Sequence, residues 1–326
     1  MIDVRRLRIL REVALAGTVT AAARALGYTP SAVSQQLAAL ERETGSELLR
    51  RRGRGVELTA EGRLLVEVAE RVGAELEAAE AELAVRAARP GGTVRLLAFA
   101  TALRTLVPRA VAALAASVPE LTLEIDEADP DDALRLLVQE RADVVVAHDY
   151  DLLERRRHAR VHRRELLADE LRVVGATGAD RGSPDAKRGA ADAKRGAPGA
   201  KGGAPGAKGG AAAPLDLATL AERAWVLPDR GSACDRVVER ACAAAGFAPR
   251  VVARSADFTA IAALAEACGA VALVPQLSLE RTAPATSDTS AAARPLTTPV
   301  RRLVFAAVRD GAQRRPLEAA VLDALA

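Results

Sequence analysis

The 326-residue sequence predicts an α/β protein in which a helical N-terminal region precedes a larger body of strands and helices. From Val4 to about Arg89, apolar side chains recur at spacings of three and four, the period of an amphipathic helix, with one basic break near Arg50–Val56. From Thr93 onward, short apolar runs such as Val144–Ala147 alternate with helical stretches. This alternation is typical of parallel sheets with crossover helices.

Residues 19–40 have the pattern of two short helices joined by a tight turn. Gly27 allows the positive φ of such a turn, and Thr29 is the expected cap of a second helix that starts at Pro30. The spacing predicts a helix-turn-helix, whose second helix reads base edges in the major groove. A simple corner of two packed helices is the alternative. The side chains expected to contact DNA from this segment are Thr20, Thr29, Pro30, Ser31, Ser34, Gln35 and Gln36, the last four of which are expected on the face opposite the core.

An arginine cluster punctuated by glycine follows between two short β-like runs. Arg50, Arg52 and Arg54 are expected at the tip of a wing that meets phosphates, with a solvated turn as the alternative. Residues 1–58 carry ten basic and six acidic side chains, so this region has a local positive charge. The sequence therefore predicts a winged helix-turn-helix DNA-binding domain over residues 1–58.

Residues 59–89 are expected to form one long linker helix. Its apolar side chains are spaced by three and four, and they are Leu65, Val68, Val72, Leu76, Ala79 and Leu83. A single helix of this length cannot bury such a stripe by itself, so we expect it to pair with a second copy of the chain in a homodimer. A dimer would also supply the paired half-sites that helix-turn-helix proteins use.

Composition excludes several classes of protein. No apolar run is long enough to span a membrane, and residues 1–6 lack the apolar stretch of a signal peptide, so a cytoplasmic protein is expected. The three cysteines do not form a disulfide framework. The basic stretch at residues 155–164 holds His158 and His162 four residues apart, a spacing that can suit a metal ion. Its arginines would repel a cation, so the stretch is interpreted as a solvated face. Neither a metal site nor a cofactor is expected. Motifs for nucleotide binding or nucleophilic catalysis are also absent, so the chain is not expected to be an enzyme.

The segment at residues 178–213 is of low complexity. It contains a seven-residue repeat rich in Ala, Gly and Pro, and it holds all four lysines of the chain. Without large apolar side chains it cannot offset the entropy of ordering, so we expect a disordered insertion. Seven of its residues are basic and three acidic, so the net charge of +3 says little about the folded part.

These motifs resemble the LysR-type transcriptional regulators over nearly the whole chain. Residues 4–8 and 17–23 are similar to the opening of that family, residues 31–41 to its recognition helix, and residues 58–62 to its junction between wing and linker. The chain departs from the family at Leu49, where Phe is common, at Gln35, where Arg is common, and at Cys268–Ala270, where a Gly-x-Gly is usual. The resemblance implies a winged helix-turn-helix, a dimerising linker helix and a two-lobed Rossmann-like effector domain similar to periplasmic binding proteins. Such regulators are commonly dimers of dimers.

The effector domain is expected over residues 92–326, with lobe 1 at about 92–165 and 305–326 and lobe 2 at about 166–304. Ligands of two-lobed α/β domains bind between the lobes, where strand ends meet helix N-termini. Helix N-termini favour anions, so a small carboxylate-bearing effector is expected, with helix capping as the alternative role of these residues. The expected effector-binding residues are Thr101, Leu103, Arg104, His148, Ser232, Ala233, Asp257, Phe258 and Thr259, with Tyr150 also near the cleft.

The sequence thus predicts a sequence-specific DNA-binding regulator that responds to a small molecule. Its expected partners are double-stranded DNA, the effector and further copies of itself. A solute-binding α/β protein without a regulatory role on DNA is the alternative.

Overall fold

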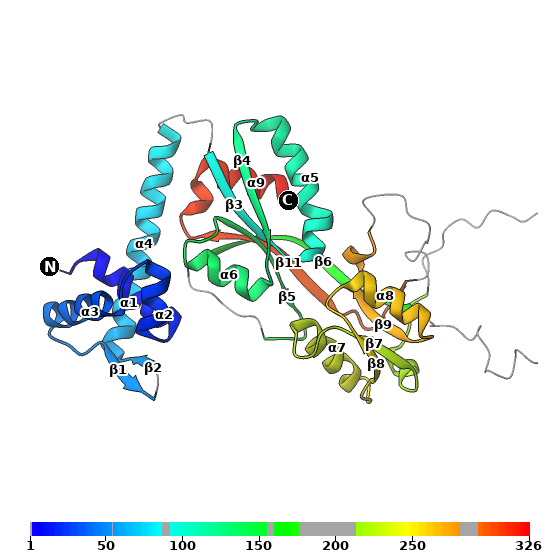
Figure 1. Cartoon of the computed structure of the whole chain (residues 1–326). Helices are drawn as coiled ribbons and strands as arrows, with labels where there is room; N and C mark the ends of the chain where they lie inside the picture. Colours follow the sequence, from blue (N-terminus) through cyan, green and yellow to red (C-terminus); the bar gives the residue numbers. More distant parts are fainter. Residues whose placement is uncertain (1, 54, 87–91, 155–159, 176–212, 281–292) are drawn as a thin grey trace, which may run out of the picture. The chain divides into compact units, whose positions relative to one another are not determined.

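The computed structural model describes residues 2–53, 55–86, 92–154, 160–175, 213–280 and 293–326 (Figure 1). The chain folds into two compact units. Unit 1 comprises Met1–His148, Arg156–Leu166 and Val304–Ala326, and unit 2 comprises Asp149–Arg155 and Leu167–Leu303. Residues 149–155, which the sequence placed in lobe 1, therefore belong to unit 2. The low-complexity segment lies outside the described residues except for Ala213. No helix in the described ranges is both long and apolar enough to cross a bilayer.

Unit 1 begins with three short helices. These are α1 (Val4–Ala16), α2 (Val19–Leu26) and α3 (Pro30–Thr44). Their caps are Asp3, Thr18 and Thr29, respectively. The side chain of each cap accepts a hydrogen bond from a backbone N–H of the first turn. Each ends at a glycine with φ of 65° to 69°, a conformation that other residues rarely adopt. Their apolar faces meet in one core that includes Leu10 and Val33, which confirms the predicted helix-turn-helix.

A β-hairpin follows the three helices. Strand β1 (Leu49–Arg52) pairs antiparallel with β2 (Gly55–Leu58). The backbone N–H of Val56 donates to the carbonyl of Gly17 at 3.1 Å. A Cβ atom at Gly55 would lie only 2.9 Å from that carbonyl oxygen, so glycine permits the close approach. The hairpin therefore packs on the turn between α1 and α2 and forms the wing.

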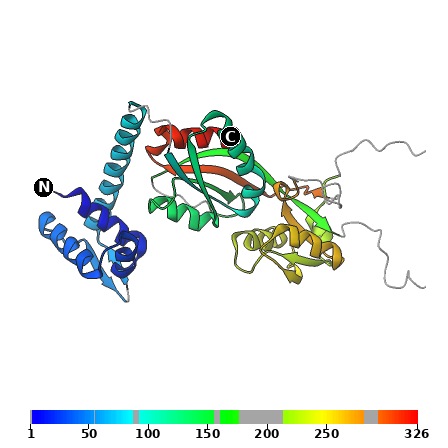
Figure 2. The same ribbon diagram turned by 45° about the horizontal axis from the view of Figure 1, so that its top comes forward.

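The long helix α4 (Ala60–Arg86) begins against this wing and runs away from the three short helices (Figures 1 and 2). The hydroxyl of Thr59 accepts the backbone N–H of Gly62 at 3.0 Å and donates to the carbonyl of Glu47 at 2.7 Å. A Cβ atom at Gly62 would lie 2.1 Å from the carbonyl oxygen of Leu48. The first turn of α4 is thus fixed to the residues that immediately precede β1.

The predicted apolar stripe of α4 has two halves with different surroundings. Leu65 and Val68 pack against the core of the three short helices. Farther along, Leu76 and Leu83 are 52% and 65% exposed. The chain's own helices therefore cover only the first half of the stripe.

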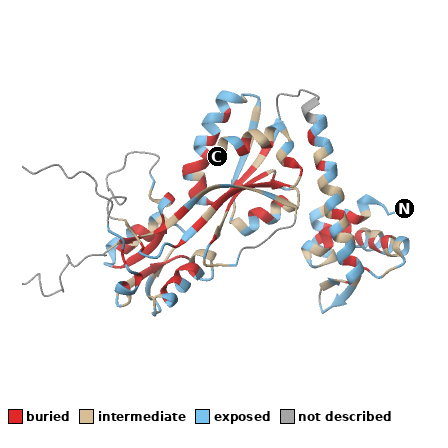
Figure 3. Cartoon of the chain, turned by 180° about the vertical axis from the view of Figure 1, so that it is seen from behind, coloured by how far each residue is buried: buried red, intermediate tan, exposed pale blue. Residues whose placement is uncertain are grey.

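The rest of unit 1 is a layered α/β fold. Its elements are β3 (Gly92–Ala98), α5 (Ala100–Ser117), β4 (Leu121–Glu127), α6 (Pro130–Val138), β5 (Val144–Tyr150), β6 (Val161–Gly175), β11 (Arg301–Arg309) and α9 (Pro316–Leu325), where β5, β6 and β11 also extend into unit 2. Strand β3 pairs parallel with both β4 and β5. Helix α6 packs on the strand face formed by Leu97, Val145 and Ala147, and buried residues lie on both the strands and the helices (Figure 3).

The strands of unit 2 have helices on both faces. Its elements are β7 (Ala224–Leu227), α7 (Ala233–Ala244), β8 (Arg250–Arg254), α8 (Phe258–Ala267), β9 (Val271–Pro275) and β10 (Arg294–Pro295), together with the second part of β6. Helix α7 packs with Trp225 and Leu227, whereas α8 packs with Val226. Because successive side chains of a strand point to opposite faces, the two helices cover opposite sides of the sheet.

The sheet of unit 2 is mixed rather than wholly parallel as the sequence suggested. Strand β7 is parallel to β8 and β9, but β6 is antiparallel to β9 and β10. Strand β6 is also longer than expected, since it includes residues 161–164 of the basic stretch that was interpreted as a solvated face. Its first half alternates charged and apolar residues irregularly, which hid the strand from the sequence pattern.

Candidate functional site

Helix α3 presents a polar face to solvent. Ser31, Ser34 and Gln35 are exposed, as are Pro30 and the capping Thr29, whose hydroxyl accepts the backbone N–H of Ala32 at 3.2 Å. Thr20 is exposed on α2. Short hydroxyl and amide side chains at these positions can reach base edges in a groove.

Gln36 differs from its expected placement on this face. Its side chain is half-buried, and its Oε1 accepts a hydrogen bond from Arg6 Nε of α1 at 3.0 Å. Arg6 also pairs with Glu43, about two helical turns farther along α3. Gln36 thus links α3 to α1, because the amide oxygen of its side chain accepts a hydrogen bond from Arg6 of the first helix.

Arg42 extends the exposed face of α3 and was missed by the sequence analysis. Ser31, Gln35, Ala38 and Arg42 follow one another at spacings of four, three and four, which places them on a single stripe. Arg42 is exposed, and its Nε donates to the carbonyl of Ala38 at 3.3 Å. The spacing of Arg42 seven residues after Gln35 could have revealed it.

The arginines of the wing are exposed and weakly paired. Arg50 lies 3.2 Å from Glu47 and Arg52 lies 3.3 Å from Glu57, and all four side chains are more than half exposed. Exposed pairs of this kind contribute about 0–1 kcal/mol, so a phosphate can replace either carboxylate at little cost. Arg54 lies outside the described residues.

The N-terminus of α5 has no side-chain cap. Its capping position is Phe99, which makes no side-chain capping hydrogen bond, and the first turn holds no acidic residue. Thr101 is 2% exposed within that turn, Leu103 is half-buried and Arg104 is exposed. The His148 ring makes an edge contact with Phe99, with 4.7 Å between ring centroids. The helix therefore begins with backbone N–H groups that can donate hydrogen bonds to an anion.

The corresponding helix ends in unit 2 carry their own carboxylates. At the start of α7, the hydroxyl of Ser232 accepts the N–H of Asp235, and the Asp235 carboxylate accepts the N–H of Gly231 at 2.8 Å and pairs with Arg254 at 2.6 Å. At the start of α8, Asp257 accepts the N–H of Thr259 at 2.8 Å.

The sequence analysis expected an anion to bind at both ends, and in the structure these carboxylates accept backbone N–H groups there. The remaining predicted residues in this part are Ala233 and Phe258, which are half-buried.

Tyr150 is buried rather than open to a ligand. Its side chain is 2% exposed, and its hydroxyl contacts the Sγ atom of Cys234 in α7. Burial raises the pKa of Tyr150 well above its usual value and raises that of Cys234 to about 11. The Cys234 thiol is therefore protonated near neutral pH. Within the described ranges, no group of three or more His, Cys, Asp or Glu side chains is placed to hold a metal ion.

Comparisons with known proteins agree with this architecture. Residues 4–63 match the family model described as bacterial regulatory helix-turn-helix protein, lysR family, and residues 87–193 and 203–326 match the LysR substrate binding domain. The chain is 30% identical over 171 residues to the HTH-type transcriptional regulator YofA of Bacillus subtilis, which covers 52% of this chain and 58% of YofA. It is 28% identical over 152 residues to the regulator TfdT of Cupriavidus pinatubonensis, covering 47% of this chain and 67% of TfdT.

Among solved structures, a full-length variant of OxyR from Pseudomonas aeruginosa has the same fold. The TM-score is 0.59 at 19% identity, and the match covers 100% of this chain and 95% of that one. The two family models together cover most of the chain, from the helix-turn-helix to the last helix. The chain therefore belongs to the LysR family of bacterial helix-turn-helix regulatory proteins.

Proposed function

We propose that this protein is a sequence-specific DNA-binding transcriptional regulator, active in the cytoplasm, whose binding responds to a small-molecule effector. The observation that carries the proposal is the polar stripe of α3, exposed beside a hairpin of exposed arginines. The names of YofA and TfdT as transcriptional regulators point the same way. The exposed second half of the α4 stripe supports a homodimer or a dimer of dimers.

In this proposal the two parts of the DNA-binding domain have different tasks. Ser31, Ser34 and Gln35 read base edges, because their short polar side chains donate to and accept from bases in the major groove. Arg50 and Arg52 of the wing hold the domain on the duplex through phosphates, which carry no sequence information directly.

The DNA-binding proposal is tested by selecting duplexes from a random pool with the full-length protein. We expect an enriched sequence, and we expect Ser34→Ala with Gln35→Ala to lose the preference while keeping weak, salt-sensitive binding. The matched control is Ser117→Ala with Gln139→Ala, which removes the same two side-chain types outside the DNA-binding domain. An unchanged selected sequence in the α3 double variant would refute the assignment of the recognition helix.

For the effector, we infer that a carboxylate binds at the N-terminus of α5. Three features of that end support it: the capping position lacks an accepting side chain, the first turn lacks an acidic residue, and Thr101 lies buried within it. The ends of α7 and α8 are less suited to an anion, because the carboxylates of Asp235 and Asp257 already accept backbone N–H groups there.

Position 100 offers a matched pair of variants for this test. Ala100 is the exposed first residue of α5, so Ala100→Glu places a carboxylate beside the free N–H groups, whereas Ala100→Gln has nearly the same shape without the charge. Thermal unfolding in the presence of acetate, succinate, citrate or benzoate is expected to show stabilisation of the wild type and of Ala100→Gln but not of Ala100→Glu. If no carboxylate stabilises the wild type, or if Ala100→Glu responds equally, the anion site is elsewhere.

A further inference from the structure

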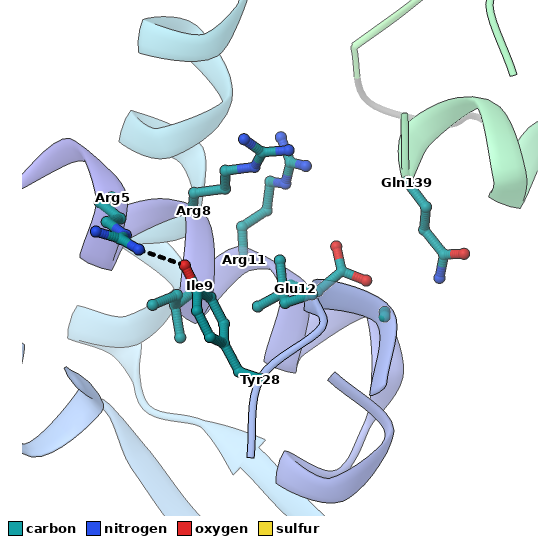
Figure 4. Close-up of a pocket in the computed structure, with 9 residues that line it drawn as sticks. Arg5, Arg8, Ile9, Arg11, Glu12, Tyr28 and Gln139 are labelled. Carbon is teal, nitrogen blue, oxygen red and sulfur yellow. Dashed lines mark hydrogen bonds between the residues drawn. The ribbon is translucent and has the colours of Figure 1, made fainter. Parts of the chain in front are cut away.

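Arg5 and Tyr28 form an ordered pair on the surface of the DNA-binding domain. Arg5 Nη2 donates to the Tyr28 hydroxyl at 2.5 Å, and the Arg5 guanidinium carbon lies 5.7 Å from the centre of the tyrosine ring (Figure 4). Both side chains are exposed, Tyr28 to 38%. They line a cavity of about 230 Å³ beside Ile9 of α1. An exposed arginine usually samples many rotamers, so two contacts to one tyrosine restrict this guanidinium to one region.

The charge of Arg5 is not neutralised by its partner. Three other arginines of this domain face carboxylates: Arg6 pairs with Glu43, and Arg50 and Arg52 pair with Glu47 and Glu57. Tyr28 is neutral, and its hydrogen bond is the main reason that the pKa of Arg5 is raised. The carboxylate of Asp3 is engaged with the backbone N–H of Arg5 as the cap of α1. Arg5 thus presents a positioned positive charge to solvent.

Tyr28 occupies the turn between the two helices of the helix-turn-helix. Its backbone N–H donates to the carbonyl of Ala23 at 2.8 Å, so the turn itself is fixed. The next residue, Thr29, caps α3. When a recognition helix enters the major groove by its N-terminal end, the preceding helix crosses the sugar-phosphate backbone. A side chain in the turn between them is therefore close to phosphates at the groove edge.

We propose that Arg5 and Tyr28 together form a clamp for one backbone phosphate of double-stranded DNA at the edge of the groove that α3 enters. The inference rests on the proposed function and adds residues that the sequence analysis did not assign to DNA. Arg5 uses one of its five N–H donors on Tyr28, which leaves the others for phosphate oxygens. The Tyr28 hydroxyl accepts from Arg5, so its own proton is available as a further donor to the same phosphate.

The test measures the salt dependence of DNA binding by the full-length protein, with a duplex recovered by selection and a mixed-sequence duplex of equal length. Between about 50 and 200 mM KCl, Arg5→Gln is expected to lower the slope of log K against log salt by about 0.9 for each DNA-bound copy of the chain, the value for one lost phosphate contact per copy. Arg5→Lys keeps the charge and should keep the slope. The matched control is Arg236→Gln, which removes an exposed arginine from α7 and should leave the slope unchanged.

Tyr28→Phe separates the clamp from a purely structural role. It removes the hydroxyl but keeps the ring, so we expect the affinity for both duplexes to fall by the same factor, about two- to tenfold, with an unchanged unfolding midpoint. A lowered midpoint with unchanged affinity would mean that the pair only stabilises the turn, and a wild-type slope in Arg5→Gln would also overturn the clamp. In either case DNA binding by α3 would stand. If the wild type selects no sequence and binds neither duplex, the proposed function fails and the clamp fails with it.

Discussion

Asp169 and Arg302 form an ion pair that is closed off from solvent inside unit 2. Their side chains are 2% and 1% exposed, and Arg302 Nε donates to Asp169 Oδ2 at 2.6 Å. The other carboxylate oxygen accepts the backbone N–H of Leu277 at 2.9 Å. Asp169→Ala removes both contacts and leaves the buried guanidinium without this carboxylate. We therefore expect the free energy of unfolding to fall by about 3–5 kcal/mol.

Urea unfolding followed by tryptophan fluorescence measures this loss directly, since the single tryptophan, Trp225, is fully buried in the same unit. The neighbouring residue provides a control: Glu170 pairs with Arg301 at 3.3 Å, but these side chains are 31% and 46% exposed. Glu170→Ala should cost less than about 1 kcal/mol.

Replacing both partners of the buried pair by apolar residues, with Asp169→Leu and Arg302→Met, should recover most of the loss. Equal small losses for Asp169→Ala and Glu170→Ala would refute the reasoning from burial.

Three further changes test other features of the chain. Burial raises the pKa of Glu12 above its ordinary value of 4.5, and among the residues that the structure describes its Oε1 has no hydrogen-bond partner. The unfolded state therefore loses this proton at lower pH than the folded state, so stability falls as pH rises through that window. Glu12→Gln should stabilise the protein at neutral pH, and urea titrations should show no gain below pH 4.5. With a pKa of about 11, Cys234 should react with iodoacetamide far more slowly near neutral pH than the exposed Cys268. Peptide mass mapping measures the labelling of each cysteine, and equal labelling of the two would contradict this prediction. Gly62→Ala would place its Cβ 2.1 Å from a backbone carbonyl oxygen and should cost about 1–3 kcal/mol in thermal unfolding, whereas Ala60→Ser at an exposed position should not.

Local signals in the sequence were sufficient for the helix-turn-helix. The cap at Thr29 and the turn at Gly27 can be predicted from the sequence itself, because capping depends on neighbours in the chain. The placement of Gln36 was not readable in this way. Its orientation depends on Arg6, which the fold brings from another helix, and no spacing rule within α3 reports that contact.

The same distinction holds for the effector domain. The sequence predicted the helix that starts near Thr101. It did not predict that Phe99 makes no capping hydrogen bond, because this is seen only in the hydrogen bonds of the first turn. The carboxylate of Asp235 is visible in the sequence three residues after Ser232. Its pairing with Arg254, which comes from the next strand, is a tertiary contact. Carboxylate placement therefore changed which helix end is the better anion site.

The contact between Gly62 and the carbonyl of Leu48 has a mechanical consequence. The first turn of α4 meets the residues just before β1 with no space for a methyl group, and Thr59 joins the same turn to Glu47 by a hydrogen bond. The wing is in turn hydrogen-bonded to the turn between α1 and α2. These contacts join α4, the wing and the turn that precedes α2 in one continuous series, so we expect a rotation of α4 to move the wing with it.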